Sequence, residues 1–490
     1  MNFVGGISLN VAFFLKEDEQ KKLMILKYLE SHPESLVKAS FFCEKLGIKP
    51  GKLEKLITEL KNELFEYEDN PKIKIEGDVL ANQNIKLSHI KQIQLNYFLE
   101  SMTFLYFRDL LEGKVTPKSF GEKHFFSEGS GYLQQRSLKR FLGEYGIKIK
   151  NGRLVGSEIK IRNLFFSILF DVFEGMRSPF PKEIDQQVND IGQLFEKYFL
   201  VDFPNTKKIK FHIFLGIVIW RVQEHCYLNE QEDYFYLNNE AYNDLISQFQ
   251  NKTHIEMKEI ACREVKYILA FLKAEGVNQL FISTNEEPFQ EIDLVSESIA
   301  KEILYRLHEE KSVKADEFIN ALKEINRNHV VFEYILSAFS SKAQFQYFFD
   351  AYPYFSTTIR STIETHKNKL LFGNSTVLNQ LFYEYAFLVN KYYAANEIEE
   401  PAYIYIDFSL GELYTQFIAD EVSCFRNMNI RVEPKLSNKI DIYLSDCIVN
   451  HLQAKSIIWK KPPTAEDWQE FGDLIISIRK RKSQSALVKR

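Results

Sequence analysis

The run Ile-Lys-Ile occurs twice in the first third of the chain, at Ile73–Ile75 and at Ile147–Ile149. β-Branched residues alternating with lysine favour a strand with one buried face. Each run follows stretches with helical spacing and precedes a turn and a second short apolar run. Each block therefore predicts helix, helix, turn, helix and a basic hairpin, the order of elements in a winged helix-turn-helix.

The first block is a predicted domain at 1–88. A first helix is expected over 18–31, and Ser35 is expected to cap a second helix with Leu36 on its buried face. After a turn at 47–51, apolar residues recur with the i, i+3, i+4, i+7 spacing of an amphipathic helix, and 72–81 is expected to form the wing. The apolar residues of this third helix are Leu53, Leu56, Ile57, Leu60 and Leu64.

The second block is a predicted domain at 89–160 and follows the same plan. It begins with an aromatic helix over 96–111, followed by a helix that Thr116 caps, and a turn at 125–131. The next helix is expected to turn Leu133, Leu138, Phe141 and Leu142 inward. Asn151-Gly152 between two short β-like runs is the strongest local signal for a hairpin, so a wing is predicted here too.

Positive charge is concentrated on the second block. The whole chain has a net charge of −5, but residues 101–162 carry 12 basic and 6 acidic side chains. Residues 1–100 are near neutral, with 14 basic and 15 acidic side chains, and the remainder has an excess of acid. A polyphosphate partner would bind where the positive charge lies.

The exposed faces of the two third helices carry the candidate DNA contacts. Arginine suits guanine and glutamine suits adenine in the major groove, while lysines suit phosphates. The competing interpretation is an ordinary solvated helix face. Glu54 and Glu59 favour this interpretation for the third helix of the first block, because they reduce the positive charge of its exposed face. The candidates are Lys49, Lys52, Lys55 and Thr58 with wing residue Lys74, and Gln134, Gln135, Arg136, Lys139 and Arg140 with wing residues Lys148 and Arg153.

The rest of the chain predicts two helical bundles and a small α/β domain. The pattern is helical from 158 to 396, and a break at 278–291 divides it into bundles at 161–285 and 286–397. After Glu399-Glu400-Pro401 the hydrophobic period changes from 3.6 to 2, which predicts an α/β domain at 398–490. Strands are expected at 403–408, 430–432 and 440–444, helices at 413–427 and 468–480, and a basic tail without fixed structure from 479. The fold class is mainly α and multidomain.

Several function classes lack their signatures. The chain has no G-x-S-x-G, Walker or G-x-G-x-x-G sequence, and no H-E-x-x-H spacing, so no enzyme, cofactor or metal site is expected. The 5 cysteines are dispersed, which suits reduced thiols. No basic leader is present, and the apolar runs are too short or too interrupted to span a membrane. A soluble cytoplasmic protein is expected.

The order of the predicted domains resembles that of the Mga/AtxA family of Gram-positive virulence regulators. The order is two winged blocks, two helical bundles and a C-terminal α/β domain. The stretches that carry the resemblance are DEQKKLMILKYLESHPESLVKASFFCEKLGI and TPKSFGEKHFFSEGSGYLQQRSLKRFLGEYGIKIKNGRLVGSEIKIRNLFF. The resemblance implies a homodimeric transcriptional regulator that binds double-stranded promoter DNA. It also implies that both bundles are PTS-regulation-like domains, with histidines phosphorylated by phosphorelay proteins of the sugar phosphotransferase system, and that 398–490 resembles an enzyme IIB domain.

Four histidines are candidates for that phosphorylation. In the first bundle His212 is the first choice and His225 the second, while His329 and His366 compete in the second bundle. A buried, hydrogen-bonded core histidine is the commoner role for each. A working enzyme IIB domain keeps a Cys or His in the loop after its first strand, but 408–412 contains neither. The resemblance therefore favours assembly over phosphoryl transfer for this domain.

Two other function classes are weighed against DNA binding. An RNA-binding antiterminator could carry the same bundles, but two winged blocks argue against it because recognition helices cannot read an A-form duplex. A phosphotransfer enzyme is disfavoured by the missing loop cysteine.

Overall fold

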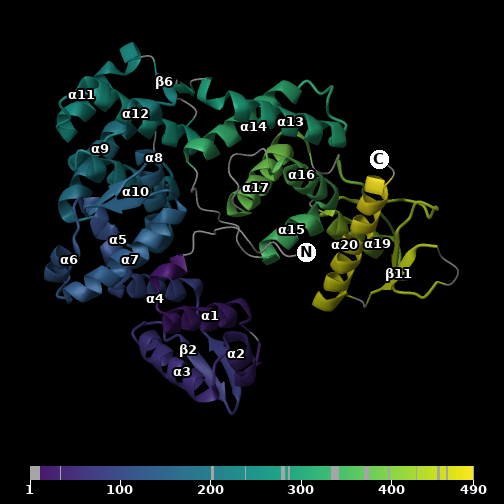
Figure 1. The fold of residues 1–490 in the computed structure, drawn as a ribbon. Coiled ribbons are helices and arrows are strands. Elements are labelled where there is room, and N and C mark those ends of the chain that lie inside the picture. The colour runs from purple at the N-terminus through teal and green to yellow at the C-terminus, as the bar shows by residue number, and fades with distance from the viewer. Residues whose placement is uncertain are drawn as a thin grey trace. The chain divides into compact units, whose positions relative to one another are not determined.

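The structure is a computed structural model of the chain (Figure 1). The described residues are 11–33, 35–199, 203–237, 239–277, 282–284, 287–332, 342–368, 375–394, 398–425, 428–449, 453–459 and 462–488. The chain divides into two compact units. The N-terminal unit is Leu9–Asn285 with Val331–Leu336, and the C-terminal unit contains Glu286–Val330 and Ser337–Arg490.

The first winged helix-turn-helix forms largely as its sequence predicts. Its elements are η1 (Val11–Phe14), α1 (Glu17–Ser31), β1 (Val37–Lys38), α2 (Ala39–Leu46), α3 (Pro50–Phe65), β2 (Lys72–Glu76) and β3 (Val79–Gln83). The predicted apolar face of α3 is buried throughout. The wing pairs antiparallel, with Ile75 opposite Leu80.

The start of the second helix in this block was predicted wrongly. Ser35 does not cap it, and Leu36 is 69% exposed. Val37 and Lys38 instead pair with β3, so that the sheet order is β1-β3-β2 and α2 begins only at Ala39. The reason is that the β-branched Val37 gains ladder hydrogen bonds and burial against Leu80, which a helical start would forgo.

The second winged block follows directly. It contains α4 (Leu87–Glu100), α5 (Met102–Asp109), η2 (Leu110–Glu112), α6 (Pro117–His124), α7 (Glu128–Glu144), β4 (Lys148–Lys150) and β5 (Arg153–Val155). The predicted Thr116 cap and the Asn151-Gly152 wing are confirmed. The predicted single aromatic helix is in fact two. Ser101 ends α4 and caps α5, accepting a hydrogen bond from Phe104 N and donating one to Phe14 O at 2.5 Å.

The first bundle is built around one buried helix, α10 (Asn205–Gln223). All but one of the residues from Phe211 to Val222 are buried in it, and the exception is His212. The surrounding elements are α8 (Glu158–Phe173), α9 (Lys182–Phe199), η3 (Glu230–Glu232), β6 (Phe235–Leu237), α11 (Asn239–Thr253), α12 (Lys258–Ala274) and β7 (Ile282–Thr284). The β6–β7 pair was not predicted. The predicted break at 278–291 lies partly outside the described residues.

The C-terminal unit begins with a helical bundle and ends in a parallel sheet. Its helices are η4 (Glu287–Phe289), α13 (Gln290–Leu307), α14 (Ala315–Val331), α15 (Lys342–Ala351), α16 (Pro353–His366) and α17 (Ser375–Tyr392). The α/β part contains β8 (Ala402–Asp407), α19 (Glu412–Ser423), β9 (Ile430–Val432), β10 (Ile442–Ser445), β11 (Lys455–Ile458) and α20 (Ala465–Val488). Among the described residues, no helix has the length and apolarity needed to cross a membrane.

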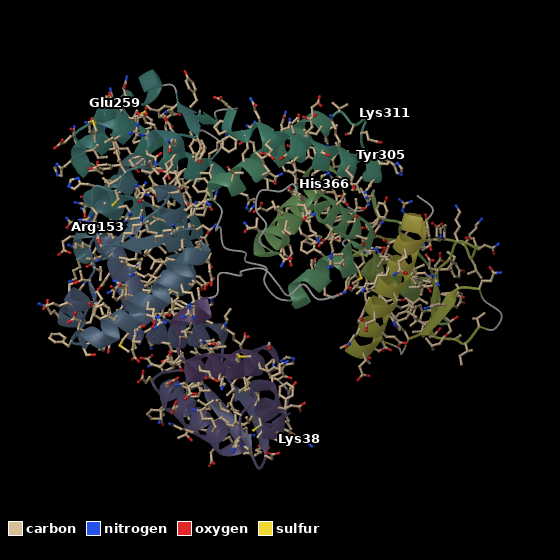
Figure 2. The ribbon with its side chains drawn as sticks, viewed as in Figure 1. Lys38, Arg153, Glu259, Tyr305, Lys311 and His366 are labelled. Carbon is tan, nitrogen blue, oxygen red and sulfur yellow. The ribbon has the colours of Figure 1, made fainter. Side chains whose placement is uncertain are left out.

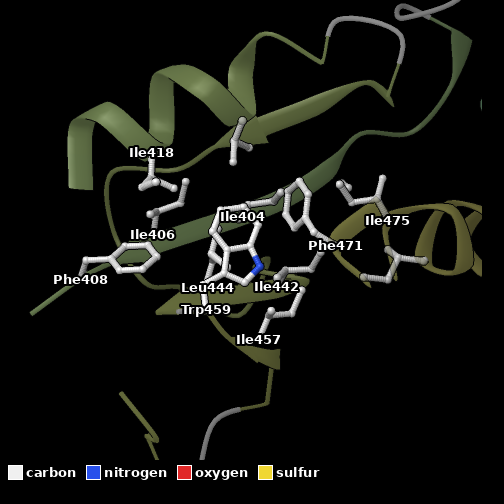
Figure 3. Close-up of a cluster of buried hydrophobic side chains, with 13 residues drawn as sticks. Ile404, Ile406, Phe408, Ile418, Ile442, Leu444, Ile457, Trp459, Phe471 and Ile475 are labelled. Carbon is white, nitrogen blue, oxygen red and sulfur yellow. The ribbon is translucent and has the colours of Figure 1, made fainter. Parts of the chain in front are cut away.

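The sheet order is β11-β10-β8-β9 and every pair is parallel. Figure 3 shows its core, in which strand residues such as Ile404 and Leu444 meet Ile418 of α19 and Phe471 of α20. The sequence predicted three of these strands and missed β11. The prediction of an unstructured tail from 479 was wrong, because α20 continues to Val488. Arg479, which is 2% exposed, anchors this extension in the unit.

A buried carboxylate joins the bundle to the α/β part of the C-terminal unit. Glu399 is 3% exposed and caps α16, accepting hydrogen bonds from Tyr354 N at 2.8 Å and Phe355 N at 3.0 Å. Its other oxygen lies 3.8 Å from Arg479 Nη2 of α20. Burial raises the pKa of Glu399 to about 7, although both backbone donors and Arg479 act in the opposite direction.

This raised pKa predicts a pH-dependent stability. The folded chain holds the Glu399 proton more tightly than the unfolded chain, so the parent should lose stability relative to Glu399→Gln as pH rises from about 4.5 to about 7. The difference in unfolding free energy should change by about 3 kcal/mol over that window. Urea unfolding of the full chain at a series of pH values measures it. Glu400→Gln, which removes an exposed neighbouring carboxylate, is the control. A pH-independent difference would contradict the assignment.

Candidate nucleic-acid interface

Helices α6 and α7 form the helix-turn-helix of the second block, and their crossing is set by two glycines. A Cβ on Gly131 of α7 would lie 2.5 Å from Pro117 O, and one on Gly121 of α6 would lie 2.6 Å from Phe126 O. Ser127 caps α7 by accepting a hydrogen bond from Ser130 N. The segment 129–131, predicted as part of a turn, is thus the first turn of α7 and its closest contact with α6.

A buried carboxylate fixes α6 on α5. The side chain of Asp109 is 2% exposed, and its two oxygens lie 3.1 Å from Lys123 Nζ and 2.7 Å from His124 Nε2. Lys123 also binds Glu112. The end of α6 and the turn into α7 are therefore held by charge-assisted hydrogen bonds as well as by packing.

The rotation of α7 differs from the predicted one. Leu138, Phe141 and Leu142 face the core as predicted, but Leu133 is 66% exposed and the prediction that it is buried was wrong. The physical reason is the close approach at Gly131, which sets the buried face by a contact that apolar spacing alone does not reveal. The exposed side chains of α7 are Tyr132, Leu133, Arg136, Lys139 and Arg140 along its outward face, with Glu128 and Glu144 at its two ends.

Two predicted base-reading residues are held at the edge of this face. Gln134 is half-buried and accepts a hydrogen bond from Thr103 Oγ1 at 2.6 Å. Gln135 is also half-buried and donates to Tyr106 Oη at 3.0 Å. Both glutamines thus attach α7 to α5. Their role in DNA contact stays a prediction, and it would require them to release these partners.

The wing of the second block presents cations beside a fixed turn. Lys148, Lys150 and Arg153 are exposed, and Arg153 is labelled in Figure 2. Gly152 has φ +79, and a Cβ there would lie 2.6 Å from Val115 O. Val115 N also donates to Gly152 O at 2.9 Å, so the tip of the wing is attached to the residue that precedes the α6 cap.

The predicted contact residues of the second block lack the carboxylate partners seen in the first block. In the part of the chain that the structure describes, no carboxylate lies within salt-bridge distance of the predicted contacts Arg136, Lys139, Arg140, Lys148 and Arg153. Free cations on α7 and on the wing create a positive potential that a phosphate backbone can neutralise.

The first block pairs most of its predicted contacts internally. Lys52 binds Asp18, and this hydrogen bond holds the pKa of Asp18 below its usual range. Lys74 lies 2.6 Å from Glu76 and lowers the pKa of that carboxyl in the same way. The remaining predicted contacts are Lys55, which lies 3.9 Å from Glu59, Thr58, which donates to Glu54 O, and Lys49, which is exposed.

The histidines of the first bundle differ in their surroundings. His212 Nε2 lies 2.7 Å from Asp185 Oδ1, which also accepts from Ser178. The ring lines a pocket of about 200 Å³ together with Asn189, Gln193 and Lys208, among others. His225 is exposed after the end of α10, with Nδ1 2.9 Å from Tyr227 Oη.

The predicted histidines of the second bundle are buried. His329 is 2% exposed, with Nε2 2.7 Å from Glu384 Oε2. His366, labelled in Figure 2, has Nδ1 3.0 Å from Thr362 O and Nε2 3.1 Å from Ser298 Oγ. Phosphorylation of either side chain would therefore require local opening of the bundle.

The loop after the first strand of the α/β part is closed by polar contacts. Ser409 donates through N and Oγ to the two oxygens of Asp446, at 2.8 and 2.6 Å. Cys424 and Cys447 are exposed and lie elsewhere, after α19 and after β10. Within the described residues, no group of three or more His, Cys, Asp or Glu side chains is arranged to hold a metal ion.

The comparisons with known proteins identify the second block. Residues 86–170 match the family model described as the Mga helix-turn-helix domain, a span that runs from the start of α4 into α8. This match confirms the predicted resemblance to the Mga family. No curated protein matches the chain.

Sequence reasoning missed two outward residues of this interface, Tyr132 and Lys150. A helical wheel anchored on Gly131 and Leu138, with 3.6 residues per turn, places Tyr132 on the same face as Arg136 and Lys139. The contact at Gly131 that selects this wheel is not visible in the apolar spacing, which predicts Leu133 on the buried face instead.

The close approach at Gly131 gives a prediction about α7. Gly131→Ala would force the helices apart, and overpacking of this kind costs about 1–3 kcal/mol. We expect faster amide exchange across 117–144, measured by hydrogen–deuterium exchange on the full chain. Gly143→Ala is the matched control on the same helix, because its Cβ would meet nothing within 4 Å. Equal exchange in both variants would show that this contact does not position α7.

Proposed function

We propose that this chain, as a member of the Mga family, is a transcriptional regulator that binds promoter DNA mainly through its second winged helix-turn-helix. The observation that carries the proposal is the outward face of α7, where Arg136, Lys139 and Arg140 are exposed and pair with no carboxylate among the described residues. The Mga helix-turn-helix match covers this same segment. No catalytic step is part of the proposed function.

The contacts divide by chemistry. A recognition helix lies in the major groove with its N-terminal residues at the base edges, while wing cations contact the backbone. Arg136 and Arg140 lie on one face of α7, and Lys148 and Arg153 lie on the wing. This arrangement supports entry of the N-terminal part of α7 into the groove, with Arg136 and Arg140 at the phosphates that border it, and phosphate binding by the wing. The first block, whose lysines pair internally, would contribute less to affinity.

An RNA-binding antiterminator is the second candidate. The major groove of A-form RNA is too deep and narrow for side chains to read, so a winged helix-turn-helix favours a DNA duplex. The binding experiment below separates the two candidates, because the same titration can be run with a matched RNA duplex.

The proposed regulator acts as a homodimer through its α/β part. The proposal rests on the enzyme IIB resemblance and is supported by exposed apolar side chains on α19, where Leu413 is 91% and Phe417 54% exposed. Large apolar groups gathered on one exposed helix favour an interface over solvent. The absence of Cys and His from 408–412 supports assembly as the role of this part.

Control by the sugar phosphotransferase system is proposed to act at His212. Transfer would form an N–P bond on its ring and break the N–P bond of a phosphohistidine on the donor protein. Asp185 orients the ring, and Lys208, which lies 3.8 Å from Glu196, lines the same pocket. The added phosphoryl charge would repel Asp185 and alter the packing of α9 on α10. The same resemblance proposes His225, His329 and His366 as further acceptors, but His329 and His366 are buried.

Removal of two cations from α7 should weaken DNA binding in a salt-dependent way. For Arg136→Ala with Arg140→Ala, we expect the slope of log affinity against log salt to fall by about two, since each lost phosphate contact changes it by about one. Mobility-shift titrations of a random-sequence duplex pool at several salt concentrations measure the slope.

The matched control is Lys311→Ala with Lys435→Ala, which removes the same charge from exposed positions in the C-terminal unit. If both double variants retain the parent's slope, α7 is not the DNA-contacting helix. Tighter binding of the RNA duplex by the parent would favour the antiterminator.

Phosphoryl transfer to His212 gives a second test. Incubation with phosphorelay proteins and a labelled phosphoryl donor should place acid-labile phosphate on the parent, and His212→Ala should remove most of it. His225→Ala is the control in the same bundle and should retain the label. Undiminished labelling of His212→Ala would exclude His212 as the main acceptor.

A further inference from the structure

Two large apolar side chains lie where the recognition helix would meet base edges. Tyr132 is 58% and Leu133 66% exposed, and both lie in the N-terminal half of α7. Apolar groups of this size usually contribute to a core or to an interface when they are neighbours on one exposed face. Neither side chain packs α7 against its neighbours, because the buried face of this helix is formed by Leu138, Phe141 and Leu142.

The surroundings of this pair indicate a nucleic-acid partner. On a helix with 3.6 residues per turn, Arg136 lies one turn after Tyr132 and Leu133, and Arg140 lies one turn further. All four side chains point outward, and the two arginines are cations without carboxylate partners among the described residues. An apolar protein partner would gain little from adjoining free cations, whereas a duplex offers phosphates beside its bases.

Within the major groove, one apolar group on the bases could contact Tyr132 and Leu133. The C5-methyl group of thymine is the apolar feature that distinguishes A·T from G·C pairs there. Recognition helices place their N-terminal residues against base edges, which is where Tyr132 and Leu133 lie on α7. Gly129, also exposed on this face, adds no side chain that would keep the groove at a distance.

We propose that Leu133, with Tyr132 beside it, reads thymine methyl groups in the major groove, so that the chain selects duplexes with thymines at set positions. This inference rests on the proposed DNA-binding function and names the base-recognising residues of that site. It assigns sequence choice to apolar contacts at the start of α7 and affinity to the cations that follow. With base contacts assigned to Tyr132 and Leu133, Gln134 and Gln135 are not needed for base recognition and can keep their hydrogen bonds to α5.

The test compares thymine with uracil, which lacks the methyl group and retains the same pairing. Duplexes enriched by the parent chain from a random-sequence pool are prepared with thymine or, position by position, with uracil. Burial of one methyl contributes about 0.8 kcal/mol, so the parent should bind about fourfold more weakly when a contacted thymine becomes uracil.

The variant Leu133→Ala completes a double-mutant cycle. It should bind the thymine duplex about as weakly as the parent binds the uracil duplex, and it should no longer distinguish the two bases at that position. Leu294→Ala is the matched control, since Leu294 is 72% exposed on α13 and should leave the parent's discrimination intact.

The outcomes separate the inference from the proposed function. If the parent binds duplex DNA but treats thymine and uracil alike at every position, or if Leu133→Ala keeps the parent's discrimination, the inference fails and DNA binding stands. If Leu133→Ala changes only the oligomeric state, measured by sedimentation, the apolar pair is a protein interface and the inference fails. Failure of the parent to bind any duplex would remove the proposed function itself.

Discussion

Two arginines and two glutamates, all buried, join three helices of the N-terminal unit, α8, α10 and α12. Arg162 of α8 binds Glu158 on its own helix at 3.0 Å and Glu264 of α12 through both terminal nitrogens, at 2.5 and 3.1 Å. Arg221 of α10 binds both oxygens of Glu158 at 2.8 Å. Burial alone would lower the pKa of Arg162, but the two carboxylates raise it above its ordinary value. Loss of any one partner would leave a buried charge uncompensated, at a cost of about 3–5 kcal/mol.

This charge cluster is connected to the second winged block through the chain. Glu158 begins α8 only three residues after β5 ends at Val155, so the wing continues into the helix that carries the cluster. At the end of α10, the side chain of Glu224 lies against Gly113, and the 113–116 loop in turn hydrogen-bonds the tip of the wing. The helix with Arg221 near its end also carries His212. A displacement of α10 would strain both the cluster and the contact with this loop. This offers a physical route from the proposed phosphoryl acceptor His212 to the proposed DNA-binding surface.

The sequence was informative where structure depends on local chemistry. Both wings, the Thr116 cap and the buried face of α3 follow from period-two alternation, turn residues and helical spacing, and all are present. The predictions that failed concern features that depend on contacts between residues distant in the sequence. The rotation of α7 is set by Gly131 against Pro117, and the extension of α20 relies on the burial of Arg479 near Glu399. The local pattern of apolar residues predicts neither contact. The predicted contacts Arg136, Lys139 and Arg140 are exposed on α7, and their role in DNA binding stays a prediction. Leu133, which was expected in the core, is exposed as well.

The two winged blocks have the same plan but differ in how their charges are satisfied. In the first block Lys52 and Lys74 are neutralised by Asp18 and Glu76, so DNA would have to compete with existing ion pairs for them. Solvent screens exposed pairs of this kind, so the competition lowers affinity without preventing contact. In the second block the cations of α7 face solvent, and phosphate binding displaces only counterions. The net charge of each block also favours the second block as the DNA contact. The pairing gives the physical reason, because it shows which cations are already neutralised within the chain. The number of lysines in a block matters less than how many have no acid beside them.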